Sequence, residues 1–209
     1  MLDALFPYEC ILCADPGDGR DLCRACADDL PWVSGPCSPA LPLSFAALAY
    51  EFPVDQLILH LKFRQGLVAG RVLGELLAEG LRQGPWERPH GPRLIPDLLI
   101  PIPLHPSRLR ERGHNQALEI ARPVSKALGI PIKHRWCCRI RATDPQSDLT
   151  GPARRKNMVG AFEADPRVAG HSVALVDDVF TTGSTAIAAS EALLQAGARA
   201  VHIWCVAKA

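Results

Sequence analysis

The chain has 209 residues, 48% of them hydrophobic, and a formal net charge of +1. This length suits one domain of ordinary size with a small appendage, and the near-neutral charge argues against a protein coated with nucleic acid over its whole surface. No apolar run reaches the roughly 20 residues that span a bilayer, and residues 1–10 lack the pattern of a secretion signal. We therefore expect a soluble cytoplasmic protein without membrane insertion.

Two CxxC pairs open the chain and are separated by ADPGDGRDL, a segment rich in turn-forming residues. Four thiolates around one tetrahedral zinc need two tight turns and a reversing loop, which PGDG supplies. A redox dithiol is the alternative, but it needs a single CxxC beside a βαβ pattern, and none follows. The spacing predicts a zinc-ribbon-like module over residues 1–42 that holds a structural Zn²⁺ on Cys10, Cys13, Cys23 and Cys26. Cys37 lacks a partner, because Ala40 stands three residues later.

Residues 43–90 are predicted to form a helical hood and linker. Apolar residues at helical spacing indicate one helix from Val54 and a second that ends near Gly84, with Gly66 and Gly70 interrupting the pattern between them. Lys62 points either toward a ligand cleft or into solvent, and the pattern does not decide between these alternatives.

Residues 98–131 read as a short apolar strand, a basic loop and a helix. The loop carries Arg108, Arg110 and Arg112, whose guanidinium groups suit a pyrophosphate, although a solvated basic loop is the alternative. Asn115 is expected to cap the helix, and Pro123 to kink it.

Residues 132–140 look like another strand, with Cys137 and Cys138 as small apolar groups. Residues 141–162 follow as a long polar segment, of a kind that is usually functional or disordered. Arg154 and Arg155 would help such a lid close on an anionic substrate, whereas a solvated loop is the alternative.

Residues 173–185, VALVDDVFTTGST, carry the strongest functional signal. An unbroken apolar run, Val173 to Val176, is typical of a strand buried on both faces of a parallel sheet. It stops at Asp177 and Asp178, and a hydroxyl-rich loop then leads into a helix that ends at Gly197. Both acids can reach one ligand only if the strand ends between them, since neighbouring side chains of a strand point to opposite faces.

The order of strand, acids, loop and helix predicts a ribose 5-phosphate site. In an open α/β sheet the ligand crevice lies beyond the carboxyl ends of the strands, where a helix N-terminus offers free N–H groups to a phosphate. Carboxylates suit sugar hydroxyls or a magnesium ion. The alternative is that Ser184 or Thr185 only caps the helix, but a cap needs one hydroxyl and this loop has four.

The same segment resembles the fingerprint of type I phosphoribosyltransferases, which bind phosphoribosyl pyrophosphate (PRPP). With the cysteine pairs, the PIPLHPSRLRERGHNQA block and the Q-S-D-L and R-R-K-N loop, the chain resembles the ComF family of competence-associated, phosphoribosyltransferase-like proteins. Two departures are His114, where an aromatic is common, and a third cysteine pair that is reduced to Cys37.

This resemblance implies an α/β fold of the type I phosphoribosyltransferase kind over residues 43–209, with a parallel sheet flanked by helices. It assigns the ribose phosphate to Asp177, Asp178, Thr181, Thr182, Gly183, Ser184 and Thr185, and the pyrophosphate side to Arg110, Arg112, Gly113, Asn115 and Gln116.

We expect a protein that binds Mg-PRPP, in which an unidentified acceptor attacks the sugar C1 and pyrophosphate leaves. The candidate catalytic residues are Asp177, Asp178, Arg154 and Arg155, with Mg²⁺ accompanying PRPP. The rival hypothesis is a non-catalytic protein that senses PRPP or a related phosphate and whose zinc module docks single-stranded DNA or a DNA-uptake protein. Pyrophosphate release would distinguish the two.

Overall fold

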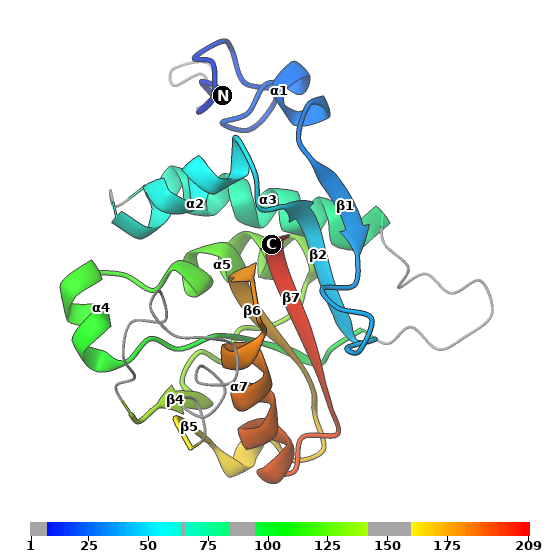
Figure 1. Cartoon of the computed structure of the whole chain (residues 1–209), viewed down its shortest axis with the longest axis vertical. Coiled ribbons are helices and arrows are strands. Elements are labelled where there is room, and N and C mark those ends of the chain that lie inside the picture. Colours follow the sequence, from blue (N-terminus) through cyan, green and yellow to red (C-terminus); the bar gives the residue numbers. More distant parts are fainter. Residues whose placement is uncertain (1–7, 64–65, 84–94, 142–159) are drawn as a thin grey trace.

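The computed structural model describes residues 8–63, 66–83, 95–141 and 160–209. A five-stranded sheet forms its centre, with helices on both faces (Figure 1). Its last four strands are parallel and its first is antiparallel, which confirms the predicted α/β class with a mostly parallel sheet. In spatial order the strands are β1 (Trp32–Gly35), β2 (Ser44–Ala49), β7 (Ala200–Lys208), β6 (Ser172–Phe180) and β3 (Leu98–Pro101).

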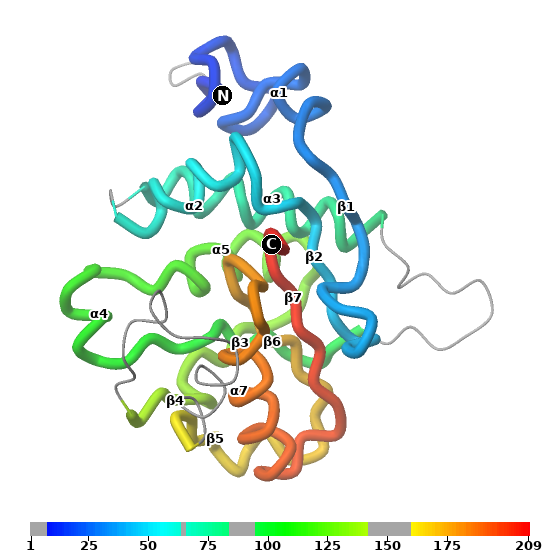
Figure 2. Tube along the Cα trace, in the orientation of Figure 1, coloured from blue at the N-terminus to red at the C-terminus, as the bar shows by residue number. Residues whose placement is uncertain are grey.

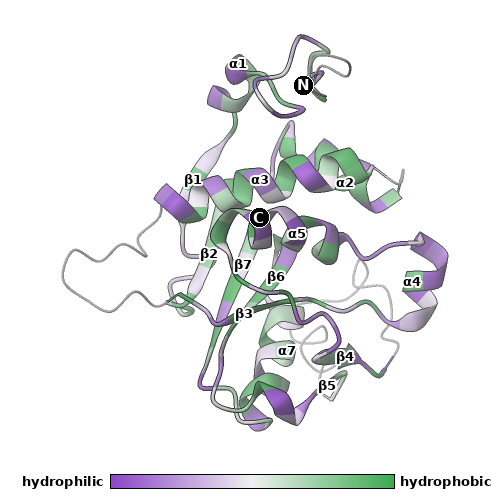
Figure 3. Cartoon of the chain, turned by 180° about the vertical axis from the view of Figure 1, so that it is seen from behind, coloured by the Kyte–Doolittle hydropathy of each residue, from purple (hydrophilic) through white to green (hydrophobic). Residues whose placement is uncertain are grey.

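Both faces of β6 are covered, which explains its unbroken apolar run. Ala174 and Val176 pack into a core with three helices, whereas Val173 and Leu175 pack into a second core on the other face. The three helices are α2 (Val54–Phe63), α3 (Leu67–Gln83) and α5 (Gln116–Leu128), and the second core contains α7 (Ser184–Gln195). Figure 3 shows hydrophobic residues gathered on the strands and inner helix faces.

The path of the chain reverses between β3 and β6. From β3, α5 leads outward to Ile132, which forms an isolated parallel bridge with Leu99 on the outer side of β3. From β6, α7 leads in the opposite direction to β7. Two right-handed crossovers in opposite directions place their helices on opposite faces and leave a crevice between the two strands at the carboxyl edge. The fold therefore predicts where a ligand site opens.

A small sheet packs near α7 and joins β4 (Cys137–Arg139) to β5 (Phe162–Ala164). The predicted strand over 132–140 is thus wrong in extent, because a turn separates Ile132 from β4. Cys137 is buried as expected, and burial raises its pKa to about 12, whereas Cys138 is exposed.

Helices α3 and α5 approach closely around Gly74 and Pro123. A Cβ at Gly74 would lie 2.3 Å from Cγ of Pro123 and 2.4 Å from the carbonyl oxygen of Ile120. Pro123 lies inside α5, as the sequence indicated. The predicted interruption at Gly70 is wrong, because Gly70 lies within α3.

The N-terminal segment forms a lobe beyond α2 and α3, with α1 (Arg24–Asp28) on the side that leads into β1 (Figure 2). Its apolar side chains Leu22, Ala27 and Leu30 belong to the same core as α3, so the lobe is packed onto the sheet domain. Arg20 and Glu79 join the two parts through an ion pair of 2.8 Å. Within the described ranges, no helix is long and apolar enough to cross a membrane.

Candidate functional site

The four cysteines of the two CxxC pairs converge, with all their Sγ atoms within 4.8 Å of one another. A tetrahedral zinc with Zn–S bonds of about 2.3 Å requires sulfur pairs about 3.8 Å apart. The Sγ atoms of Cys13 and Cys23 lie 3.7 Å apart. Cys23 also caps α1, since its Sγ accepts from the Cys26 N–H at 3.4 Å. The donor set and spacing fit a structural zinc ion.

A second site opens at the carboxyl edge of the sheet, as a cavity of about 580 Å³ at the chain reversal. The pairing of β6 with β3 ends at Val176, where the Ile102 N–H donates to the Val176 carbonyl at 2.9 Å. Beyond this point β6 continues to Phe180 beside β7 while residues 102–105 turn away from it. The resulting gap receives side chains from α2, α4 (Pro106–Arg112), α5, β4, β6, α7 and β7.

Asp177 and Asp178 both line this cavity, but they lie inside β6. The expectation that the strand ends between them is wrong, because Val179 and Phe180 continue the pairing with β7. Adjacent strand residues point to opposite faces, but both acids still reach the cavity, because β6 has no β3 neighbour beyond Val176 and its free edge borders the gap. Asp178 faces α2, where its Oδ2 forms an ion pair with Nζ of Lys62 at 2.8 Å. Asp177 lies opposite Cys205 of β7 in the sheet.

The two acids have different electrostatic surroundings. Burial raises the pKa of Asp177, and the neighbouring Asp178 carboxylate adds to the shift. The Lys62 ammonium offsets the negative charge of Asp178, whose side chain is 6% exposed. The cavity therefore holds one carboxylate paired with a cation and one that binds its proton tightly.

The hydroxyl-rich loop lines the same cavity with all five predicted residues: Thr181, Thr182, Gly183, Ser184 and Thr185. Helix α7 begins at Ser184, so the orphan N–H groups of its first turn lie at the cavity. Gly183 precedes the helix at φ 71°, and a Cβ there would lie 2.5 Å from the Phe180 ring. The N-cap is Gly183, which has no side chain, and the Thr182 Oγ1 accepts from the Ser184 N–H at 3.4 Å. Since Gly183 occupies the N-cap position, neither Ser184 nor Thr185 is the cap.

The predicted basic loop is largely helical, because residues 106–112 form α4. Arg108 and Arg112 line the cavity, and Arg112 donates to Oε1 of Gln116 at 2.7 Å. Burial lowers the pKa of Arg112, and also that of Arg139 on β4. Partly desolvated guanidinium groups of this kind favour an anionic ligand.

Three predicted residues, Arg110, Gly113 and Asn115, do not line the cavity. Gly113 ends α4 at φ 82°, and Arg110 is exposed on α4. Asn115 caps α5, accepting from the Ala117 N–H at 3.0 Å and donating to the Ile102 carbonyl at 3.1 Å. Residues 142–159 lie outside the described residues. They include Arg154, Arg155 and most of the predicted lid.

Several lining residues were not among the predicted site residues. Lys62 was considered and left open, whereas Phe63, His105, Ser107 and Arg139 were missed. His105 and Ser107 belong to the PLHPS segment whose arginines were selected, so the segment was a usable signal. Phe63 and Arg139 belong to distant elements, and no local pattern connects them with β6.

A larger cavity of about 770 Å³ lies between the N-terminal lobe and α3. Its charged groups are already engaged in part, since Arg20 pairs with Glu79 and Arg82 donates to the Ala127 carbonyl at 2.7 Å. It contains neither a hydroxyl-rich loop nor a long helix N-terminus, so the smaller cavity is the better candidate site.

Comparisons with known proteins match the N-terminal and the C-terminal parts of the chain to different families. Residues 1–48 match a double zinc ribbon domain and residues 114–209 a phosphoribosyl transferase domain. The DNA utilization protein YhgH of Salmonella typhimurium is 32% identical over 206 residues, which cover 95% of this chain and 89% of that protein. The chain belongs to the ComF/YhgH family. This confirms the resemblance inferred from the cysteine pairs and residues 173–185.

Competence protein F of Haemophilus influenzae is a further relative, 34% identical over 163 residues, which cover 77% of this chain and 70% of that protein. Among solved structures, glutamine PRPP amidotransferase from B. subtilis is 23% identical with a TM-score of 0.40. The match covers 64% of this chain and spans 25% of that chain.

Proposed function

We propose that the cavity at the carboxyl end of β6 binds Mg-PRPP and that the protein transfers the phosphoribosyl group to an acceptor. One observation carries the proposal. The hydroxyl-rich loop, the N-terminus of α7 and both acids of β6 line one cavity at the chain reversal. The loop and helix supply N–H and hydroxyl donors for a phosphate, and the acids supply acceptors for a sugar.

Each group of residues has a distinct role. The loop over 181–185 holds the 5-phosphate, while Asp177 and Asp178 accept hydrogen bonds from the ribose hydroxyls. Arg112 and Gln116, with Arg108 and Arg139 nearby, face the pyrophosphate. The two carboxylates are also the hard oxygen ligands that suit Mg²⁺, which neutralises part of the charge on the pyrophosphate.

The reaction exchanges two bonds at the sugar C1. The acceptor forms a bond to C1, the bond from C1 to the pyrophosphate oxygen breaks, and pyrophosphate leaves with that electron pair. The ribose gains positive charge as this bond breaks, so carboxylates beside it stabilise the transition state. The arginines stabilise the leaving group, and no nucleophilic side chain is needed.

Calorimetric titration of Mg-PRPP into variants tests the site. At about pH 9, above the raised Asp177 pKa of about 8, Asp177→Asn and Asp178→Asn each replace a charged acceptor. A charge-assisted hydrogen bond contributes roughly 1.5–3 kcal/mol, so the affinity should fall about ten- to a hundredfold. Thr182→Ala should cost less, because backbone donors remain. Glu163→Gln, at an exposed position of β5, is the matched control. Parent-like affinity in both Asn variants would contradict the assignment.

Turnover requires a separate assay. Phosphorus NMR of the protein with Mg-PRPP, first with a panel of free bases and then with single-stranded DNA, reports pyrophosphate release directly. Release that depends on an added acceptor supports the transferase. Saturable binding without release with every acceptor supports a PRPP sensor.

A second candidate function, contact with DNA, is supported by the distribution of charge and by relatives named for DNA utilization and competence. Residues 95–141 contain nine Lys and Arg against three Asp and Glu, whereas residues 1–42 contain two against seven. Phosphate backbones are attracted to cations and repelled by acids. The charge therefore favours DNA contact through 95–141 rather than through the zinc module.

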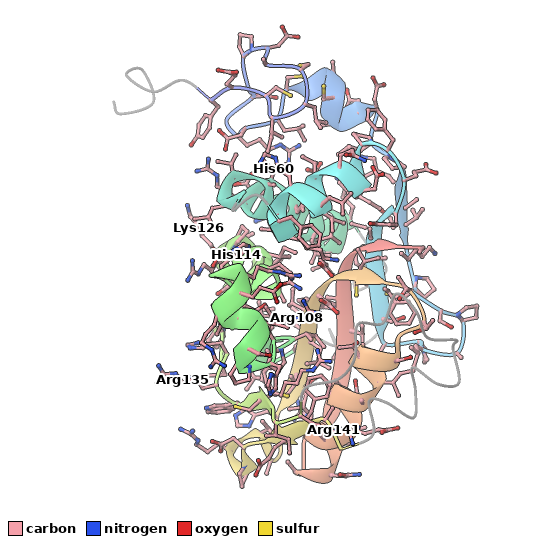
Figure 4. The ribbon with its side chains drawn as sticks, turned by 60° about the vertical axis from the view of Figure 1, so that its left-hand side comes forward. His60, Arg108, His114, Lys126, Arg135 and Arg141 are labelled. Atoms are coloured by element: carbon pink, nitrogen blue, oxygen red, sulfur yellow. The ribbon has the colours of Figure 1, made fainter. Side chains whose placement is uncertain are left out.

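The exposed cations of this segment lie on the side of the molecule that carries α4. Figure 4 shows Arg108, Arg135 and Arg141 on this side, together with His114. Among the described residues, the exposed Arg110 and Arg135 form no ion pair with a carboxylate. Unneutralised side chains of this kind are suited to phosphates.

Binding of a fluorescent oligothymidylate at several salt concentrations tests this surface. Arg110→Gln and Arg135→Gln should each weaken binding and reduce the slope of log K against log salt by about 0.7, the value for one single-strand phosphate contact. Arg24→Gln in the zinc module is the matched control. A larger loss in the control would place the DNA on the zinc module.

A further inference from the structure

Lys62 lines the cavity but is not among the residues assigned to the ribose or the pyrophosphate. It lies in the last turn of α2, and its Nζ is 2.8 Å from Oδ2 of Asp178. Asp178 is buried, whereas the Lys62 side chain is partly exposed. The ammonium therefore pairs with a buried carboxylate while it stays accessible to a molecule that enters the cavity.

The end of α2 is held against the turn between α4 and α5 by contacts of the two neighbours of Lys62. Nε2 of His114 donates to the Leu61 carbonyl at 2.9 Å, since a carbonyl oxygen can only accept. The guanidinium of Arg112 lies over the Phe63 ring, 5.6 Å from its centroid. The position of Lys62 at the cavity therefore does not depend on its ion pair alone.

A second cation acts on the same carboxylate. Burial lowers the pKa of Arg112, and the charge of Asp178 partly offsets this shift. Arg112 also lines the cavity, beside Phe63, the residue that follows Lys62. Lys62 and Arg112 thus approach Asp178 from α2 and α4, so this part of the cavity holds two positive charges against one buried carboxylate.

These two cations are not needed for a single phosphate. The loop over 181–185 and the N-terminus of α7 offer hydroxyl and N–H donors to one phosphate group. A diphosphate brings a second charged group, which needs donors elsewhere. An ammonium has three N–H donors, and the ion pair with Asp178 engages one of them. Lys62 can therefore donate to an anion without leaving Asp178.

We propose that Lys62 makes the cavity selective for a diphosphate over a single phosphate, by donating to the diphosphate while it stays paired with Asp178. The selectivity itself is a property of the cavity. Its assignment to the pyrophosphate group of PRPP rests on the proposed function.

Asp178 can serve Lys62 and a sugar together. Its Oδ1 accepts from the Val179 N–H at 2.8 Å, and its Oδ2 pairs with Lys62. Each carboxylate oxygen accepts about two hydrogen bonds, so a ribose hydroxyl still finds an acceptor there. The ion pair thus connects the residue assigned to the ribose with the cation that faces the diphosphate.

Calorimetric titration of inorganic pyrophosphate and inorganic phosphate into the zinc-loaded protein tests this selectivity without a sugar. Lys62→Met removes a charged donor, so the affinity for pyrophosphate should fall about ten- to a hundredfold. The affinity for phosphate should fall much less, because the donors of the loop and α7 remain. Lys62→Arg keeps the charge and should retain most of the preference.

The matched control is Lys126→Met, the same substitution at an exposed lysine outside the cavity, which should change neither affinity. An equal loss for both anions in Lys62→Met overturns the proposal.

A double variant separates direct contact from neutralisation of charge. Lys62→Met leaves the Asp178 charge unpaired, which repels any anion. Lys62→Met combined with Asp178→Asn removes both charges of the pair and leaves the net charge of the cavity as in the parent. Pyrophosphate binding that stays weak in this variant supports direct contact, because the donor is still missing. Recovery to the affinity of the parent shows that Lys62 only neutralises Asp178, and overturns the proposal. With no carboxylate left unpaired, this variant also serves if Lys62→Met fails to fold.

Mg-PRPP and ribose 5-phosphate, titrated into the same variants, distinguish this inference from the proposed function. Lys62→Met should weaken Mg-PRPP binding by the same factor as pyrophosphate binding, and ribose 5-phosphate binding much less. A parent that binds pyrophosphate through Lys62 but does not bind Mg-PRPP overturns the proposed function and supports this inference. If Lys62→Met keeps the preference of the parent for Mg-PRPP over ribose 5-phosphate, this inference is wrong and the proposed function stands. A parent that binds neither pyrophosphate nor Mg-PRPP overturns both.

Discussion

The zinc module and the β6 cavity differ in how their polar groups are completed. In the module, four identical ligands from residues 10–26 face one point, so a single ion satisfies all of them. In the cavity, acids, arginines and hydroxyls come from four helices and strands and the loop before α7, and only some are paired, such as Lys62 with Asp178. The module is therefore a closed structural centre, whereas the cavity is an open one whose charges a ligand can complete.

The largest effect should follow from removing one cysteine ligand of the zinc module. Cys10→Ser removes one of four thiolates and should abolish the single zinc per chain, because structural zinc contributes roughly 10 kcal/mol or more to folding of such sites. Metal analysis of purified protein decides this, with Cys138→Ser as control. Hydrogen exchange should rise first in residues 8–30 and later in α3, which shares their core. Full zinc in Cys10→Ser would refute the four-thiolate site.

In the cavity, the ion pair between Lys62 and Asp178 should give the next largest effect. Lys62→Met leaves a carboxylate that is 6% exposed without its cation. Breaking a fully buried pair costs about 3–5 kcal/mol, and because Lys62 is 23% exposed we expect about 2 kcal/mol. Urea unfolding measures it. Adding Asp178→Asn to Lys62→Met should recover most of the loss, and simple addition of the two losses would show that the residues do not interact.

Asp177 should make the stability of the open site depend on pH. Its raised pKa means that the folded chain holds the proton more tightly than the unfolded chain. Stability is then present at low pH and lost as pH rises from the ordinary aspartate pKa of about 3.9 through the raised value. Asp177→Asn does not titrate, so its stability relative to the parent should increase by at least about 1 kcal/mol between about pH 5 and about pH 9. A constant difference in urea unfolding would contradict this.

The smallest effect concerns the ion pair that connects the N-terminal lobe to α3. Arg20 and Glu79 connect the lobe to α3 at 2.8 Å, with side-chain exposures of 23% and 36%. Partly exposed pairs contribute about 0.5 kcal/mol. A double-mutant cycle with Arg20→Gln and Glu79→Gln should give a coupling of this size that decreases in high salt. A coupling several times larger would make the ion pair, rather than shared apolar packing, the main link.

Local spacing predicted the parts of each site that lie within one segment. The cysteine pairs and the order of strand, acids, loop and helix in 173–185 are such cases, because a few bonds determine their geometry. Lys62 and Arg139 reach the cavity from α2 and β4, and only the tertiary packing of those elements brings them there. The continuation of β6 past Asp178 likewise depends on pairing with Ala207 and Lys208.

The prediction of a basic loop where α4 forms is an error that the sequence itself could have prevented. Pro106 stands at the first helical position and Gly113 at the C-cap, the combination that commonly begins and ends a helix. The three arginines of this segment were interpreted through their charge alone, as a basic loop. Recognising the helix would have separated exposed Arg110 from Arg112, which faces Gln116 and the cavity.

The pairing of β2 with β7 determines the order in which parts of the newly synthesised chain can fold. Phe45 lies beside Trp204, about 160 residues later, so β2 cannot take its place in the sheet until β7 has been synthesised. At roughly 5–20 residues per second, this interval lasts about 10–30 seconds. The four thiols need no later residue and are complete as soon as Cys26 has left the ribosome. Zinc can thus organise the beginning of the chain while the apolar strand β2 has only β1 beside it and still lacks its parallel neighbour.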